Sequence, residues 1–187
     1  MSAPFNNIRS KTNRAVCAYL IGKGIGGQDN IRPGNSPLAK TYPNVTARVI
    51  IGKPEVPLIG VYRVNLALHI RGSAATDPAV LDQNGHFGLV QFEKLLSNVN
   101  DAMMISADGF TLCQTAEDIT TAGRLLTLPA GNTPEAIQAA QNNADMADFT
   151  MQNIYDDGFG EGDPSAVGCD WEEIILFQAL VCGSNTD

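Results

Sequence analysis

The chain has 187 residues, of which 20 are acidic and 12 are basic, so its formal charge is −8 with both histidines neutral. This balance argues against general binding of polyanions, and we expect no sequence-specific recognition of nucleic acid. Apolar residues make up 44% and charged residues 17% of the chain, against a usual charged share of about 25%, which is typical of a globular protein rather than a disordered one. One domain over residues 1–187 fits this length.

Neither a membrane span nor a secretion signal is visible in the sequence. The longest apolar runs fall far short of the ~20 residues that cross a bilayer, and the first seven residues lack an apolar core. We therefore expect a protein made in a cytoplasm, with no membrane partner. The four cysteines show no close pair and no metal-type spacing, and we expect free, mostly buried thiols. They are Cys17, Cys113, Cys169 and Cys182.

Charge is divided unevenly along the chain. Residues 1–72 contain ten basic and two acidic side chains, a net charge of +8, whereas residues 73–187 contain two basic and 18 acidic ones, a net charge of −16. Two solvated faces of different sign would explain this split. If the charges also separate in space, the basic side of one copy can bind the acidic side of the next, which is a heterologous contact that can close into a ring.

The first expected element is a helix that ends by Gly22, because its apolar residues fall on one stripe. That stripe contains Ile8, Ala15, Val16, Tyr19 and Leu20, whereas Arg9, Lys11, Asn13 and Arg14 fall elsewhere. Residues 22–44 are rich in glycine and proline, which predicts an irregular connection or arm. A short strand is expected over Thr46–Ile51, closed by Gly52, Pro54 and Pro57.

Residues 60–72 alternate between apolar and polar side chains, which predicts a half-buried strand. One face holds Tyr62, Val64, Leu66, Leu68 and Ile70, and the other holds Arg63, Asn65, Ala67, His69 and Arg71. Asp77-Pro78 predicts the start of a helix that reaches residue 99. A second helix is expected over Thr115–Leu126, with Thr115 and Asp118 as a capping box, and a third from Thr133 to Met146.

Two strands are expected at the end of the chain, over Phe149–Tyr155 and Trp171–Cys182, joined as a hairpin by an acidic loop at 156–170. Both faces of the last strand are apolar, so it is expected to be central in the sheet or covered by a partner. The predicted fold is α+β, with a mixed or antiparallel sheet of about four strands and helices mainly on one face.

No motif predicts a cofactor or a catalytic site. Gly22–Gly27 has the GxGxxG spacing of dinucleotide-binding loops, but the preceding segment is helical and the following prolines prevent a phosphate-binding helix. Asp156, Asp157, Glu161 and Asp163 could bind calcium, although a solvated hairpin tip explains them as well. His69 and His86 are the two imidazoles, and neither has a recognisable catalytic partner in sequence.

The strand GVYRVNLALHIRGSA, the helix after Asp77 and the closing strand CDWEEIILFQALVC resemble the tail-terminator or tail-completion proteins of tailed bacteriophages. This resemblance covers the order of elements over residues 45–182. It implies a virion protein, assembled in the host cytoplasm, that forms a ring of six copies. In such a ring the partners are other copies, the tail-tube protein and a neck or head-completion protein, and genomic DNA passes through the centre. The longer 22–44 connection and the expanded region 101–147 leave another head-tail joining or neck protein open.

The resemblance implies no catalytic residue, cofactor or metal. The candidates for subunit contacts are Arg48, Arg63, His69, Arg71, Asp156, Asp157, Glu161, Asp163, Glu172 and Glu173. Two functions of other classes stay open. One is a small-ligand or nucleotide-binding enzyme domain that uses the Gly22–Gly27 loop, and the other is a monomeric adaptor that binds a basic partner through its acidic half.

Overall fold

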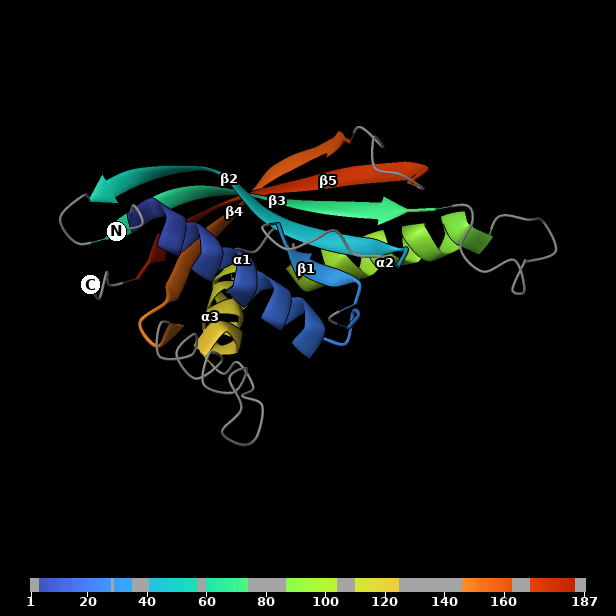
Figure 1. The fold of residues 1–187 in the computed structure, drawn as a ribbon. Coiled ribbons are helices and arrows are strands. Elements are labelled where there is room, and N and C mark those ends of the chain that lie inside the picture. The colour runs from blue at the N-terminus through green and yellow to red at the C-terminus, as the bar shows by residue number, and fades with distance from the viewer. Residues whose placement is uncertain are drawn as a thin grey trace, which may run out of the picture.

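The computed structural model describes residues 4–27, 29–34, 41–56, 60–73, 87–103, 110–124, 146–162 and 169–183. These residues form three helices and five strands, shown in Figure 1. The helices are α1 (Pro4–Gly22), α2 (Phe87–Met103) and α3 (Phe110–Arg124). The strands are β1 (Ile31–Pro33), β2 (Asn44–Val56), β3 (Val61–Gly72), β4 (Thr150–Glu161) and β5 (Trp171–Cys182).

The strands form one sheet in the order β1-β2-β3-β5-β4. The β1 strand pairs parallel to β2, and every other pairing is antiparallel. This confirms the α+β class and the mixed sheet, with one strand more than the expected four. The additional strand, β1, lies inside the segment 22–44 that was expected to be irregular. Ile31 opposes Val45 in register and both side chains are buried, so core packing favours pairing here.

The closing hairpin and the central place of its last strand are confirmed. The β5 strand lies between β3 and β4, and both pairings run along most of its length. Phe177 opposes Leu66 on the buried side. The alternate residues Ile174, Leu176 and Leu180 are half-buried on the other side. Pairing on both edges places β5 in the interior of the sheet. The helices cover one of its apolar faces, and no described helix covers the other.

Two strands are longer than the sequence predicts. The β2 strand continues through Gly52 and Pro54, because the short β1 leaves this part of β2 with one neighbour, and a proline there removes no ladder bond. The β4 strand reaches Glu161, so Asp156 and Asp157 belong to a strand rather than to the predicted 156–170 loop. Register shifts within β4 accommodate this acidic segment, and Gly158 adopts a φ of 92°.

The helices confirm some predicted bounds and correct others. The first helix ends at Gly22 as expected, and α2 extends beyond residue 99 to Met103. Because α3 begins at Phe110, Thr115 is a buried residue inside the helix and does not cap it. The expected helix start at Asp77, His86 and most of the expected helix from Thr133 lie outside the described residues.

Figure 1 shows the three described helices on the same side of the sheet. The α1 helix packs on β1 and β2, α2 on β3, and α3 on α1 and β4. The core lies between this helical layer and the sheet. Residues of all five strands and all three helices contribute to it.

The first helix is buried beyond its predicted apolar stripe. Lys11, Thr12 and Asn13 are all buried, so the expected polar side of this helix is wrong for Lys11 and Asn13. Asn13 Oδ1 accepts a 2.9 Å hydrogen bond from the Val49 N–H. The ammonium of Lys11, whose side chain is 1% exposed, lies 3.1 Å from Asp148 Oδ1. Contact with the sheet on one side and α3 on the other explains this burial, since each polar group has a partner.

We expect Asp148→Ala to lower the free energy of unfolding by about 1–3 kcal/mol, because it removes a partner of a buried ammonium. The double variant Lys11→Met with Asp148→Ala should recover part of that loss, since no unpaired charge then remains. Urea unfolding of the two variants and of Lys11→Met alone measures the coupling. Additive losses in the double variant would contradict a direct interaction.

We expect Cys17 to resist thiol reagents in the folded protein at pH 8. Burial raises the pKa of its thiol to about 12, with a hydrogen bond at the Ala47 backbone opposing part of that rise, so the reactive thiolate is scarce. The exposed Cys113 should react first. Mass spectrometry of peptides after timed labelling, with a urea-unfolded control, checks the order. Equal rates at the two cysteines would show that α1 is not packed as described.

Candidate interaction surface

The side of the sheet that faces away from α1, α2 and α3 carries no described helix (Figure 1), and we call it the outer face. Strand register assigns its residues, because Arg71 opposes Glu172 and Ala67 opposes Leu176. The central strands contribute Arg63, Asn65, Ala67, His69, Arg71, Glu172, Ile174, Leu176, Gln178 and Leu180. The predicted division of β3 into two faces is confirmed, since Val64, Leu66, Leu68 and Ile70 are buried on the opposite side.

Three of the sequence-predicted residues meet at one end of the outer face. Glu172 Oε1 lies 2.9 Å from His69 Nδ1 and 2.8 Å from an Arg71 guanidinium nitrogen. The Glu172 side chain is 5% exposed, and Arg71 also donates to Thr46 Oγ1 at 3.3 Å. A carboxylate buried this far needs such partners. The contacts hold the three side chains in fixed positions between β3 and β5.

Arg48, Lys53 and Arg63, the other basic residues on β2 and β3, are exposed. Arg63 binds Glu55 with two nitrogens, at 2.9 and 3.1 Å, and this ion pair lowers the pKa of Glu55. Arg48 is exposed and opposes Ala67 in register, which places it on the outer face. Ile50, at a register shift of β2, is 51% exposed. The outer face therefore combines positive charge on β2 with apolar side chains on β5.

Two predicted acidic residues lie on the other side of the sheet. Asp156 opposes Phe177 and Glu173 opposes Ile70, so both share the side that the helices cover. They line a groove of about 320 Å³ next to α2. Asp157 accepts a hydrogen bond from Gln178 at 3.2 Å. The remaining predicted acids cannot be placed, because Asp163 and the side chain of Glu161 lie outside the described residues.

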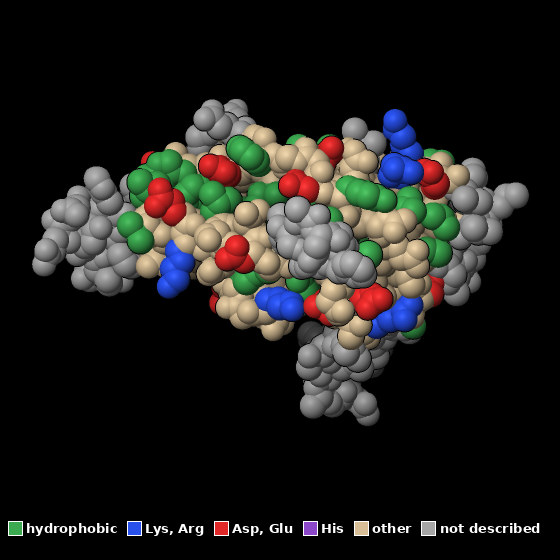
Figure 2. All heavy atoms as spheres, turned by 180° about the vertical axis from the view of Figure 1, so that it is seen from behind, with side chains coloured by type: hydrophobic (Ala, Val, Ile, Leu, Met, Phe, Trp, Pro, Cys, Tyr) green, Lys and Arg blue, Asp and Glu red, His purple; other side chains and the backbone are tan. Residues whose placement is uncertain are grey.

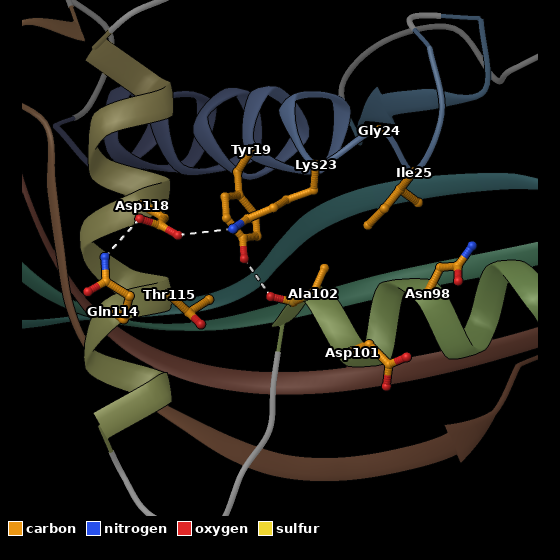
Figure 3. A pocket seen from close by; sticks show the side chains of 10 residues that line it. All are labelled: Tyr19, Lys23, Gly24, Ile25, Asn98, Asp101, Ala102, Gln114, Thr115 and Asp118. Carbon is orange, nitrogen blue, oxygen red and sulfur yellow. Dashed lines mark hydrogen bonds and ion pairs between the residues drawn. The ribbon is translucent and has the colours of Figure 1, made fainter.

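A separate cavity of about 510 Å³ lies where the three helices meet (Figure 3). Lys23 crosses it to bind Asp118 at 3.2 Å, and Gln114 donates to the same carboxylate at 3.0 Å. These contacts lower the pKa of Asp118, the Gln114 hydrogen bond first. Tyr19 donates to the Ala102 carbonyl, and burial raises the pKa of its hydroxyl. Lys23, Gln114, Asp118 and Tyr19 thus use polar groups of their side chains in contacts within the protein.

The Gly22–Gly27 segment does not have the setting of a dinucleotide loop. It follows the end of α1, and the next element is the strand β1 rather than a helix. Phosphate binding by such loops depends on backbone N–H groups at the start of a following helix. Gly24 and Ile25 do line the helical cavity of Figure 3. They approach it from the C-terminal end of α1, where the N–H groups of Lys23, Gly24 and Ile25 already donate to carbonyls of the last turn and are not free for a phosphate.

Part of the charge split along the sequence is satisfied within one molecule. Lys11 binds Asp148, Lys23 binds Asp118, and Arg71 binds Glu172. Each of these pairs joins the basic first part of the chain to the acidic remainder. The charges left for a partner are those without a described ion pair that also lie at the surface, such as Arg48 and Lys53 on β2.

Sequence reasoning missed several surface residues. Phe159 is 83% exposed and lines the groove beside Asp156 and Glu173, but its position between two glycines gave no indication of an accessible aromatic ring. Ile50 is exposed through an irregularity in β2 that no local pattern signals. The role of Glu55 could not be predicted, because its contact with Arg63 depends on how β2 pairs with β3. These features depend on register, which alternation alone does not determine.

Within the described residues, no group of three or more histidine, cysteine, aspartate or glutamate side chains could hold a metal ion. No described helix combines the length and the apolar character that crossing a bilayer requires. Comparison with known proteins found no matching family model and no matching curated protein. The surface chemistry of the chain is therefore the basis for a functional proposal.

We expect Leu66→Asp to prevent folding and Arg63→Ala to leave the chain folded. Leu66 is buried opposite Phe177, so an aspartate there places an unpaired charge in the core. Arg63 is exposed and solvent screens its ion pair with Glu55, so losing it costs little stability. Circular dichroism and urea unfolding compare the two variants. Equal losses of stability would mean that the two faces of β3 are assigned incorrectly.

Proposed function

We propose that this chain is a structural subunit that assembles with copies of itself into a ring, and that the ring is a tail terminator of a bacteriophage-like virion. In that role it caps the tail tube and joins it to a neck protein, while DNA passes through the centre. The location in the virion rests on the resemblance in element order. The self-assembly rests on the surface described above.

The observation that carries the proposal is the composition of the outer face. Ile174, Leu176 and Leu180 form an apolar row on β5 that no described helix covers. Tyr155, 56% exposed, opposes Gln178 on the same side. Apolar surface bordered by charges is typical of protein contacts. A sheet with one helical layer and a second, partly apolar face on which no described helix packs is suited to burying that face against another subunit.

A ring requires a heterologous contact, in which two different surfaces of the subunit meet. The subunit offers different chemistry on its two sides, with arginine and lysine on β2 and an acidic groove beside α2. Burial of apolar area, at roughly 25 cal/mol per Å² before the costs of association, would provide most of the affinity. Opposite charges would select the register and speed the encounter, so added salt should slow assembly more than it dissociates a finished ring.

We expect cryo-electron microscopy of assembled particles that contain this chain to show a ring of adjacent copies at the head-proximal end of the tail tube. Leu176→Lys, on the outer face, should be excluded from particles. Assembly would bury the lysine charge without a partner, whereas burial of the wild-type leucine is favourable. Thr121→Lys, on the exposed side of α3, is the matched control and should be incorporated normally. Both variants should keep the circular dichroism spectrum of the wild type. Single copies without a neighbour would overturn the proposal.

A further inference from the structure

The groove beside α2 has an apolar floor and an acidic rim. Leu96 and Ile175 contribute to its floor, with the exposed ring of Phe159 beside them. Glu93, Asp156 and Glu173 supply three carboxylates, and none of the described residues that line it is a lysine or arginine. A groove of this chemistry fits an apolar side chain flanked by positive charges.

Its position explains why the groove is open in the described structure. The α2 helix packs on β3 and reaches β5, whereas β4 continues along the edge of the sheet. Phe159 opposes Ile175, so it lies on the side that the helices cover elsewhere. It is nonetheless 83% exposed. Figure 2, seen from behind the view of Figure 1, shows hydrophobic and acidic side chains interspersed along the upper part of the molecule.

The same chain presents the complementary chemistry on β2. Ile50 is 51% exposed at a register shift, and the exposed Arg48 and Lys53 lie on either side of it along the strand. Neither base has a described ion pair, whereas the neighbouring Arg63 is held by Glu55. We call Arg48, Ile50 and Lys53 the basic knob. An apolar side chain between two bases matches an apolar floor between acids.

One copy cannot join its own knob to its own groove. Arg48 and Lys53 oppose Ala67 and Arg63, which places these two bases of the knob on the outer face, whereas the groove lies on the helical side of β4 and β5. The two sites are also separated across the sheet, because β3 lies between β2 and β5. Contact between them must therefore connect two molecules. Since the two surfaces differ, each copy retains a free knob and a free groove for further copies.

We propose that the acidic groove of one copy receives the basic knob of the next copy. Ile50 packs on Leu96, Phe159 and Ile175, while Arg48 and Lys53 face the three carboxylates on the rim. This inference rests on the proposed ring, for which it names a complementary pair of surfaces beside the apolar row of the outer face. The occupant is a second copy of this chain, and the basis for choosing it is the match of charge and apolar surface.

Reciprocal charge reversal tests the pairing. The groove variant Glu93→Lys with Glu173→Lys and the knob variant Arg48→Glu with Lys53→Glu should each lose self-association by at least tenfold in sedimentation equilibrium. An equimolar mixture should regain it, because each reversed groove then meets a reversed knob. Glu117→Lys, an exposed charge reversal on α3 outside the groove, is the matched control and should associate like the wild type.

A photo-crosslinking side chain at position 159 identifies the contact directly, in concentrated protein and in assembled particles. We expect adducts between copies within residues 48–53. Adducts elsewhere on a second copy, adducts only to another protein, or unimpaired association of both variants would overturn the knob and groove while leaving the ring proposal standing. Absence of any association in solution, together with single copies in particles, would overturn both.

Discussion

The fold depends on how the first helix satisfies its polar residues inside the protein. Asn13 binds the backbone of β2 at Val49, and Lys11 binds Asp148 just before β4. One helix thereby fixes the second strand and the closing hairpin, two regions far apart in the sequence. Because buried polar groups need partners in specific positions, these bonds select one arrangement of α1 on the sheet. The irregularity of β2 that exposes Ile50 begins next to Val49, so the same bond also helps to position the basic knob.

The elements with a clear hydrophobic period could be predicted from sequence. Alternation identified β3 and its two faces, and the apolar character of both faces of β5 indicated a central strand. Features that depend on distant partners could not be predicted. Lys11 can be buried because its ammonium binds Asp148. Since Asp148 lies 137 positions away in the sequence, no local pattern indicates this contact. Pro54 remains in a strand because β1 is too short to pair with it. Local propensity indicates neither of these tertiary effects.

The candidate surface was predictable in charge but not in arrangement. Placing Arg71 beside Glu172 required the β3–β5 register, and the sequence alone gave no reason to separate Glu172 from Glu173. Adjacent residues in a strand point to opposite faces, so one binds in the ion cluster while the other lines the groove. The acidic residues therefore have two different roles. Some acids hold the monomer together, and others remain at its surface.

The irregular edge strand has a consequence for behaviour at high concentration. Two register shifts interrupt β4, and Asn153 has a φ of 50°. At the opposite edge, β1 is only three residues long, and the part of β2 beyond it contains Pro54 and two register shifts. A straight, unpaired edge is a template for backbone pairing with other chains, and bulged or short edges are poor templates. Copies crowded together before assembly would therefore resist fusing into continuous fibres through these edges. This favours association through side chains, whose chemistry limits which surfaces can meet.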